Sequence, residues 1–543
     1  MGSAVQAATY KAASTTSAEL ACWNPRLMSA DRKMLPEKAK AEARAHDLVR
    51  NNGYARGAVQ NQKDRLVGDG YRLQLQPVYK LLGIDSDVAA KWASQVEVAF
   101  HAWADDPDCW IDVQRKRTFT QFLREAAASE LVQGEFFLVR QWKGSPVGYS
   151  TCFTSVEPER ISTPAQAIMG IGMNQTEMVA PNGNRIRAGV ELLKDGEAVA
   201  YHIRQTHEND VNSVSLAGTA GVWDRITKVN EFGWRQVIHI FEADSPDQTR
   251  GFSAFASTLQ KMKMMDMQED LELQLSQLST AFAMYIKTPG GRAKAEQIMG
   301  TNDAEEFARF MGDIMDMQSA HYGAAGVNIN GVKLPVLAPD DDIGVVASHN
   351  QPTNHEQFKD GLNRQNARGL GMSVEEYTGD FTKNSFSGMK GVMSMSWQLV
   401  KAKREAIINK LATLMFRLWF DEAIVRGTIT PPPGVDYWPS NDPVMGQRFA
   451  WLTKATWIGS GKLVIDEYKQ AKANETALGT HQASLSDVLA ESGTDIESHL
   501  DTAVRERQMF IERGLPLPEH LGGTPRGAVM ADGLAQQQDN QPA

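Results

Sequence analysis

The hydrophobic positions between Met389 and Arg426 predict one long helix. Apolar residues recur there at intervals of three, four or five, close enough to the helical period to form one apolar face. These residues are Val392, Met395, Leu399, Ala402, Ala406, Leu411, Leu414 and Leu418. No proline interrupts the run, and Gly427 and then Pro431 follow it, as expected at a helix end. At 1.5 Å per residue the helix would be roughly 55 Å long, so we expect it to be the spine of the chain.

The N-terminal part of the chain predicts an arm, two helices and a strand. Residues 1–35 are rich in Ala, Ser and Thr without periodicity, which predicts a flexible segment. From Pro36 a helix is expected up to Gly53, and a second helix to about Gly68. Residues 71–77 alternate like a strand.

A capped helix with an aromatic face is expected next. Ser86 can cap a helix in which four large apolar residues share one face. They are Trp92, Val96, Phe100 and Trp103. We interpret that face as core, which is commoner for such a pattern than a ligand site. Thr118 and Gln121 have the spacing of a capping box, and Gly134 ends that helix before the strand at 135–142.

Short apolar runs separated by turn residues predict a β-rich module at 150–242. Asp195-Gly196 between two strand-like arms is a strong hairpin signal. Ser253 is then expected to cap a helix that runs through Lys287. Its apolar positions include Phe255, Leu259, Met262, Met265, Leu273 and Phe282.

The remaining segments predict an insert and a helical C-terminal region. Residues 288–345 have a helical pattern near 303–318 and a strand-like run at 327–337. After the long helix, further helical segments are expected at 444–456, 464–473, 484–489 and 496–513. The Gly, Pro and Gln-rich tail is expected to be disordered.

Composition places the chain among folded, soluble, intracellular proteins. With 543 residues, 42% apolar and 22% charged, it should form two to four packed units. No apolar run reaches the 18 or more residues of a membrane span, and no secretory signal is recognised. Cys22, Cys109 and Cys152 are widely spaced, so we expect free thiols rather than disulfides or zinc. A net charge of −10 argues against a surface that grips nucleic acid throughout.

The motifs that could carry catalysis or bind a cofactor are incomplete. Residues 457–462 resemble the end of a phosphate loop, but Leu463 follows Lys462 where Ser or Thr is required, so a turn before a helix is the better interpretation. His355-Glu356 is not part of an HExxH motif, and no GxSxG or EF-hand loop occurs. Residues 340–342 are all Asp, and a solvated turn is favoured over a cation site. We therefore expect no enzyme activity, cofactor or metal.

Several blocks together resemble the portal proteins of lambda-type tailed bacteriophages. The blocks are RNNGYARGAVQNQKDRLVGDGYRL at 50–73, CWIDVQRKRTFTQFLREA at 109–126, VQGEFF at 132–137, DQTRG at 247–251, FDEAIVRG at 420–427 and WIGSG at 457–461. They are co-linear with the family at similar spacing over nearly the whole chain. The resemblance implies an α+β, mainly helical portal fold with wing, stem, clip and crown, and a ring-forming subunit.

The resemblance also implies a division of the chain. It gives an N-terminal arm at 1–35, wing at 36–250, a stem helix at 251–287, clip at 288–345, a second stem helix at 346–372, a tunnel loop at 373–390, the spine helix at 391–427, wing edge and crown at 428–514, and a tail at 515–543.

A portal of this family is a ring, usually of twelve copies, at one capsid vertex, and double-stranded DNA passes along its axis. The implied partners are terminase and head completion or connector proteins at the clip, and major capsid and scaffold proteins at the wing, with no membrane. The implied location is the virion, after assembly in the host cytoplasm. A different structural ring, or a nucleic-acid-processing enzyme, is the alternative; the enzyme would need a carboxylate or His cluster that the sequence lacks.

Candidate channel residues follow from the same resemblance. The tunnel loop offers Asp380, Lys383, Asn384 and Lys390 as residues near DNA, and the acidic run Asp266, Glu269, Asp270 and Glu272 is a candidate stem lining. Lys383 could contact phosphates weakly, or it could pair with Asp380. The acidic run could equally be a solvated outer face. Twelve copies at −10 each would carry about −120, so unless basic residues line the bore, the field there repels DNA and lets it slide.

Overall fold

The computed structural model describes the chain in two compact units. The described residues are 10–15, 17–146, 148–164, 177–207, 222–282, 309, 313, 316, 326–329, 332–335, 355–382, 385–435, 437, 445–464, 466–518 and 521–522. Unit 1 comprises residues 1–257 and 369–543, and unit 2 comprises residues 258–368.

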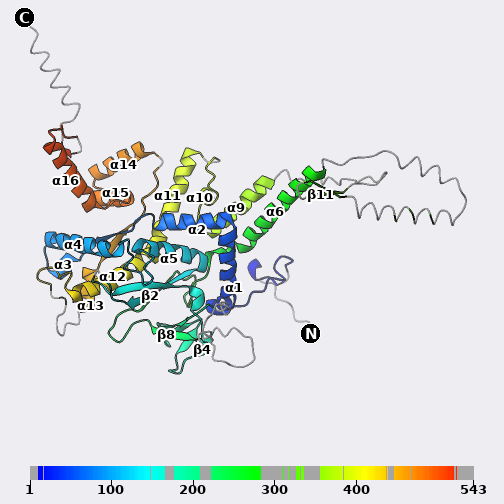
Figure 1. Cartoon of the computed structure of the whole chain (residues 1–543), viewed down its shortest axis with the longest axis horizontal. Coiled ribbons are helices and arrows are strands. Elements are labelled where there is room, and N and C mark those ends of the chain that lie inside the picture. The colour runs from blue at the N-terminus through cyan, green and yellow to red at the C-terminus, as the bar shows by residue number, and fades with distance from the viewer. Residues whose placement is uncertain are drawn as a thin grey trace, which may run out of the picture. The chain divides into compact units, whose positions relative to one another are not determined.

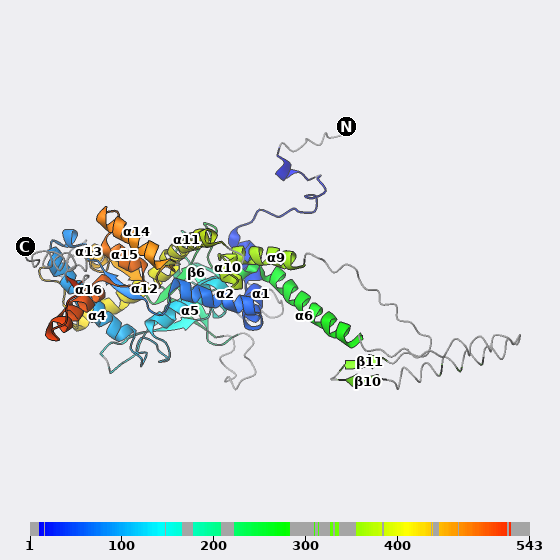
Figure 2. The same ribbon diagram turned by 90° about the horizontal axis from the view of Figure 1, so that it is seen from above.

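Helices are the commonest secondary structure among the described residues of unit 1. They are α1 (Ala30–Asn51), α2 (Gly53–Leu66), α3 (Tyr79–Leu82), α4 (Ser86–Ala104), α5 (Phe119–Gln133), α10 (Val374–Thr378), α11 (Phe386–Lys403), α12 (Lys410–Arg426), α13 (Met445–Leu452), α14 (Glu467–Gly479), α15 (Leu485–Glu491) and α16 (Ile496–Glu512). Short 3₁₀ turns lie at Lys11–Ala13, Pro158–Arg160 and Ala254–Ser257. Figures 1 and 2 both show α2 beside α5.

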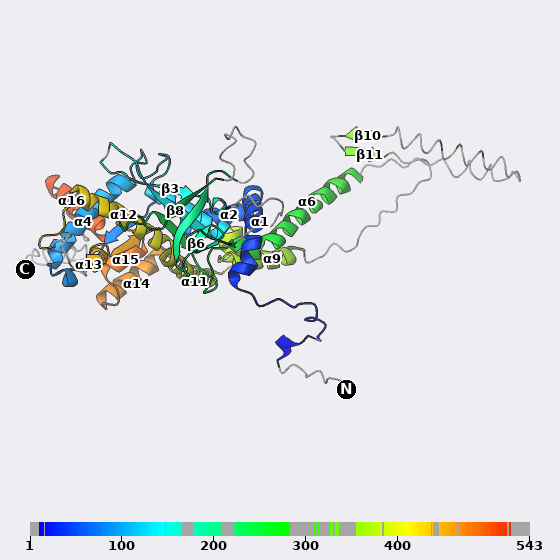
Figure 3. The ribbon, with the colours of Figure 1, turned by 90° about the horizontal axis from the view of Figure 1, so that it is seen from below.

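Within the described ranges, the strands of unit 1 form three antiparallel sheets. The two-stranded sheet pairs β1 (Arg72–Leu75) with β12 (Ala455–Ile458). A three-stranded sheet has the order β3-β2-β9, formed by β3 (Thr151–Val156), β2 (Glu135–Trp142) and β9 (Val237–Phe241). The third is a meander of β4 (Glu177–Val179), β5 (Arg185–Arg187), β6 (Val190–Leu192), β7 (Ala198–Arg204) and β8 (Trp223–Thr227). Figure 3 shows β3, β6 and β8 from below.

The spine is helical from Phe386 to Arg426, as the apolar pattern predicted. A π-helical turn, η4 (Arg404–Asn409), interrupts it between α11 and α12. A π-turn accommodates one residue more than an α-turn, so the faces on its two sides are out of phase. The single predicted apolar face is therefore wrong in the first half, where Met395 is 68% exposed and Leu399 is 46% exposed.

The main core of unit 1 is built around an aromatic cluster. The ring of Phe100 on α4 lies 5.2 to 5.3 Å from the rings of Phe119, Phe416 and Trp419. The predicted apolar face of α4 is thus confirmed as core, and Trp92, Val96 and Trp103 are buried with it. The capping box at Thr118 and the left-handed Gly134 that ends α5 are also confirmed.

Other boundaries differ from the sequence prediction. Helix α1 begins at Ala30 and contains Pro36 in its first two turns, so the arm is shorter than predicted. The predicted helix at 444–456 is wrong in its second half, because α13 ends at Leu452 and β12 follows. Pairing of β12 with β1 supplies hydrogen bonds that outweigh local helical preference.

The described part of unit 2 includes two helices and a hairpin. Helix α6 (Leu259–Phe282) and helix α9 (His355–Gly369) are joined by an ion pair of Glu269 with Lys359 at 2.5 Å. Strands β10 (Gly326–Ile329) and β11 (Val332–Pro335) form a hairpin where one strand-like run was predicted. Leu273, predicted as an apolar position of α6, is 63% exposed. The residues expected to extend this helix to Lys287 lie outside the described ranges, as do Asp340–Asp342, most of the expected helix at 303–318 and most of the tail.

Candidate functional site

The predicted tunnel loop begins with a well-capped short helix. Ser373 and Glu376 form a reciprocal capping box at the start of α10, and Gly379 ends that helix with φ of +71°. The exposed Asp380 carboxylate then accepts hydrogen bonds from the backbone N–H of Thr382 at 2.9 Å and its hydroxyl at 2.6 Å. This side of the loop is held in one conformation by local hydrogen bonds.

The centre of the loop holds two of the predicted channel residues. Lys383 and Asn384 lie outside the described residues, so their roles stay predictions. Ser385 opens α11 by accepting a hydrogen bond from its first turn. Lys390 is exposed on α11 and its charge helps to lower the pKa of Asp466, whose main stabilising partner is the backbone N–H of Lys469. Lys390 therefore lies close to a carboxylate of its own chain.

Both ends of the loop are anchored to α2. Arg65 on α2 lies 3.2 Å from the carboxylate of Glu376, which also accepts a hydrogen bond from Ser396 of α11 at 2.7 Å. Asn61 donates to the backbone carbonyl of Glu376 at 2.6 Å. Burial lowers the pKa of Arg65, and the Glu376 carboxylate opposes this shift. Helices α10 and α11 are thus fixed to one rigid support.

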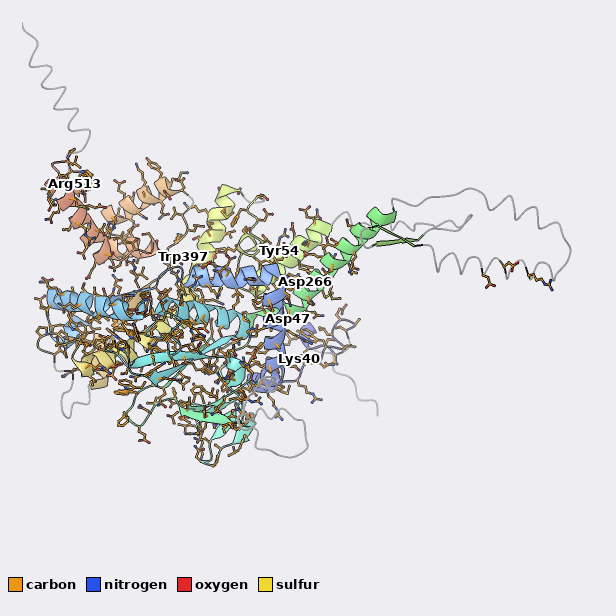
Figure 4. The ribbon with its side chains drawn as sticks, viewed as in Figure 1. Lys40, Asp47, Tyr54, Asp266, Trp397 and Arg513 are labelled. Carbon is orange, nitrogen blue, oxygen red and sulfur yellow. The ribbon has the colours of Figure 1, made fainter. Side chains whose placement is uncertain are left out.

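Aromatic contacts and a cavity complete this anchor. Tyr54 at the start of α2 stacks on Tyr377 with ring centroids 5.4 Å apart, and the Arg404 guanidinium lies 5.0 Å from the Trp397 ring centroid. Figure 4 labels Tyr54 and Trp397 on their helices. A cavity of about 420 Å³ lies between α2, the loop and residues 460–463.

Arg404 joins the spine to the segment WIGSG. It donates to the carbonyls of Leu66 at 2.8 Å, Arg65 at 2.7 Å and Ser460 at 2.7 Å. It therefore satisfies the carbonyls that α2 leaves unpaired at its end. A Cβ atom at Gly459 would lie 2.6 Å from the Tyr71 ring, which explains the glycine in this motif.

The phosphate-loop pattern at 457–462 is accounted for by this junction. Trp457 and Ile458 belong to β12, and the Lys462 backbone N–H donates to the Glu491 carbonyl at 2.8 Å. The segment links a strand to α14 and α15 and is occupied by protein contacts. The prediction that a helix follows a turn here is correct, with α14 beginning at Glu467.

The segment DQTRG forms a buried ionic cluster with β2 and α1. Arg250 is 2% exposed and lies 2.7 Å from the carboxylate of Glu135, which also contacts Lys38 at 3.0 Å and His239 at 3.0 Å. Arg250 also donates to the carbonyls of Pro158, Ile161 and Ala188. Burial would raise the pKa of Glu135, but Arg250 and Lys38 hold it well below its usual value.

A second acid ties α1 to the same segment. Asp31, which is 2% exposed, accepts hydrogen bonds from the backbone N–H of Thr249 at 2.9 Å and from its hydroxyl at 2.5 Å. Arg187 of β5 contacts Asp31 at 3.1 Å. DQTRG therefore joins α1, β2 and the β-rich module, which is a structural role.

The predicted stem acids have mixed surroundings on α6. Glu269 is paired with Lys359 of α9, and Glu272 accepts from Gln268 at 3.5 Å. Asp266, labelled in Figure 4, is half-buried, and Asp270 is exposed. The facing of these acids in an assembly stays a prediction.

Metal-ligand clusters, thiols and apolar helices were the remaining features of the described residues that could indicate another kind of site. No group of three or more His, Cys, Asp or Glu residues there could hold a metal ion. Cys22 is exposed, Cys109 and Cys152 are buried, and all three are free thiols as predicted. Burial raises the pKa of Cys109 and Cys152. Within the described ranges, no helix is long and apolar enough to cross a membrane.

Sequence reasoning missed the residues that hold these elements together. Two of their contacts, Arg65 with Ser396 and Arg404 with Leu66, join segments more than 300 residues apart in the sequence. No spacing rule links such pairs, and none links Glu376 to Arg65 or Ser396. Asp31 was assigned to the arm. Of these residues, only Arg65 lies in a quoted block, at 50–73, and no sequence signal pointed to Glu376, Arg404 or Asp31.

Comparison with known proteins gives a consistent result. A family model described as "Phage portal protein, lambda family" matches residues 16–404. Portal protein B of Escherichia phage lambda is 32% identical over 506 residues, covering 92% of this chain and 89% of that protein. The portal protein of Escherichia phage N15 is 31% identical over 502 residues, covering 92% and 90%.

A solved structure is similar at a lower level. The match is to "Neck of native GTA particle computed with C12 symmetry", with a TM-score of 0.35 and 14% identity, covering 85% of this chain and 99% of that one. The family model's match, residues 16–404, includes the DQTRG segment, α10 and α11. The chain belongs to the lambda family of phage portal proteins.

Proposed function

We propose that this portal subunit assembles into a closed ring, with twelve copies as the family resemblance implies, at one vertex of the capsid. Double-stranded DNA would pass through its channel during packaging and again during ejection. Membership of the portal family, with a match covering about nine-tenths of both this chain and its phage relatives, supports this function. A closed ring requires heterologous contacts, in which two different surfaces of each copy meet.

The described elements suit the parts of such a ring. We assign the wing to 36–250, the stem to 251–287 and 346–372, the clip to 288–345 and the tunnel loop to 373–390. The spine is 391–427, and wing edge and crown are 428–514. The continuous helical path from Phe386 to Arg426 supports the spine assignment, and the ion pair between α6 and α9 supports a paired-helix stem.

The channel is proposed to slide DNA rather than hold it. Each firmly neutralised phosphate releases counterions and adds affinity, so a channel for moving DNA needs few such contacts. Lys383 of the loop, facing the duplex from each copy, would add weak and salt-sensitive contact. The net charge of −10 per copy is consistent with a repulsive channel field.

The partners follow from the same assignment. We propose that the clip docks terminase and later the head completion proteins, and that the wing meets capsid and scaffold proteins. The subunit itself would be structural and not an enzyme, first assembling in the host cytoplasm and then residing in the virion.

Electron microscopy of negatively stained protein tests the central claim. Rings with a central hole are expected, and light scattering should give the mass of a closed oligomer. A protein that stayed monomeric or dimeric at micromolar concentration would contradict the proposal. Turnover of nucleic acid with a divalent metal would favour the enzyme alternative.

A further inference from the structure

A groove of about 500 Å³ lies in unit 1 between the turn at 230–235 and helices α12 and α13. Its walls are mainly apolar. Phe232 and Trp234 form one side, and Leu414, Leu418 and Phe449 form the other. Helices α12 and α13 lie side by side in Figures 1 and 3, and the rings of Phe420 and Phe449 are 6.2 Å apart.

The turn that forms one wall is rigid. The Asn230 side chain accepts hydrogen bonds from the backbone N–H groups of Phe232 at 3.1 Å and Trp234 at 2.8 Å. Gly233 supplies the positive φ of +82° that the turn requires. Phe232 is nevertheless 82% exposed. An exposed aromatic side chain on a backbone fixed by hydrogen bonds is the kind of residue that anchors protein interfaces, because little backbone entropy is lost on binding.

Neighbouring aromatic residues support the wall from behind. Trp234 stacks on Trp142 with centroids 6.0 Å apart and planes 16° apart, and the Arg140 guanidinium lies 4.8 Å from the Trp234 centroid. Trp142 is itself 55% exposed. The aromatic surface thus extends beyond the groove itself.

The groove is lined by more cationic than anionic side chains. Arg235 and Arg417 both line it, and burial together with the nearby Arg235 lowers the pKa of Arg417. Arg417 donates to the Thr453 hydroxyl at 3.0 Å, whereas the Arg235 guanidinium has no side-chain partner among the residues described. The one carboxylate in the lining, Asp421, already accepts from the Tyr437 hydroxyl at 3.0 Å, and burial raises its pKa.

We infer that this groove binds an acidic peptide segment of another protein, in which an apolar side chain lies beside a carboxylate. The apolar side chain would pack between Phe232 and Leu418, and the carboxylate would meet the guanidinium of Arg235, which can bind it with two parallel hydrogen bonds. A duplex phosphate backbone fits less well, since it offers no apolar group for the walls. The inference goes beyond the portal function and does not depend on the ring number.

A peptide selection with the full-length protein tests this inference. A random twelve-residue library displayed on yeast would be sorted for binding to the purified protein and, separately, to the double variant Phe232→Ser and Arg235→Gln. Both side chains are at least partly exposed, so the variant should fold. Tyr468→Ser with Arg185→Gln, which removes an exposed aromatic residue and an exposed Arg elsewhere in unit 1, is the matched control.

The expected result is enrichment of peptides with Asp or Glu within two residues of an aromatic or aliphatic side chain. Their affinity should fall at least tenfold in the groove variant and stay unchanged in the control. Enriched peptides without acids, or equal binding to the groove variant, would overturn the inference. Loss of oligomers in the groove variant alone would also overturn the inference, because the groove would then be a contact between copies. Binding of a dT oligonucleotide that depends on the groove would overturn it too, because the groove would then be a nucleic-acid surface.

Discussion

Replacing Arg250 by Met should be among the most damaging changes in the wing. Methionine fills similar space but provides no hydrogen-bond donor, so the carbonyls of Pro158, Ile161 and Ala188 lose a partner. Glu135, which is 0% exposed, would keep only Lys38 and His239 as side-chain partners. Both losses occur at buried or part-buried groups, where water can replace the missing donors only in part.

The magnitude can be worked from these contacts. Removing one member of a buried ion pair typically costs about 3–5 kcal/mol, and each buried carbonyl left unsatisfied adds about 1–3 kcal/mol. Relaxation and water entry will recover part of that total, so we expect a loss of at least about 4 kcal/mol. Since whole domains are stable by about 5–15 kcal/mol, the variant should be close to unfolded at 37 °C.

Urea unfolding followed by tryptophan fluorescence measures this loss. Lys228→Met is the control, because its ion pair with Glu197 is at the surface, with the two side chains 23% and 59% exposed, and should contribute under about 1 kcal/mol. Arg250→Lys should fall between the two, since it keeps the charge but not the planar set of donors. An unfolding midpoint for Arg250→Met equal to that of Lys228→Met would refute the reasoning.

Three further predictions, made with four substitutions, test other parts of the molecule. Leu411→Asp places a charge in a core position that is 0% exposed, so it should cost several kcal/mol of folding stability and stop ring assembly. Leu414→Asp changes a half-buried position and should have a milder effect. Equal ring yields from the two variants would contradict this. Burial raises the pKa of Glu97 to about 8. The hydrogen bond from the Leu75 N–H opposes this shift, and the acids at the start of α16 reinforce it. The contribution of Glu97 to stability is therefore present below pH 4.5 and is lost as the pH rises towards 8. Glu97→Gln should then raise the melting temperature more at pH 8.5 than at pH 5. An equal effect at both pH values would count against the raised pKa. Lys383→Ala should leave rings intact but lower the DNA retained per particle after a salt challenge, and unchanged retention would remove Lys383 from the mechanism.

The local features of the fold were predictable because they depend on neighbours in the sequence. The capping box at Thr118, the stop at Gly134 and the hairpin at Asp195-Gly196 each require only a few adjacent residues, and all are present. The aromatic face of α4 was predictable for the same reason.

The long-range polar contacts were not predictable from one sequence. Asp31 meets Thr249, and Arg404 meets the end of α2, across separations for which no periodicity exists. The exposed Met395 and Leu399 were misassigned because periodicity assumes a uniform α-helix, and η4 breaks that uniformity. The family resemblance located the blocks that contain some of these residues without giving their partners.

The π-helical turn at Arg404–Asn409 makes the orientation of α11 and the tunnel loop depend on the number of residues in that turn. Deleting one codon in this turn would leave an uninterrupted α-helix with every other side chain retained. Each residue of an α-helix turns about 100° around its axis, so α11 would then present a different side to α2, and the contact between Ser396 of α11 and Arg65 of α2 could not form. Small insertions and deletions in this turn should therefore be far less tolerated than substitutions of its exposed side chains.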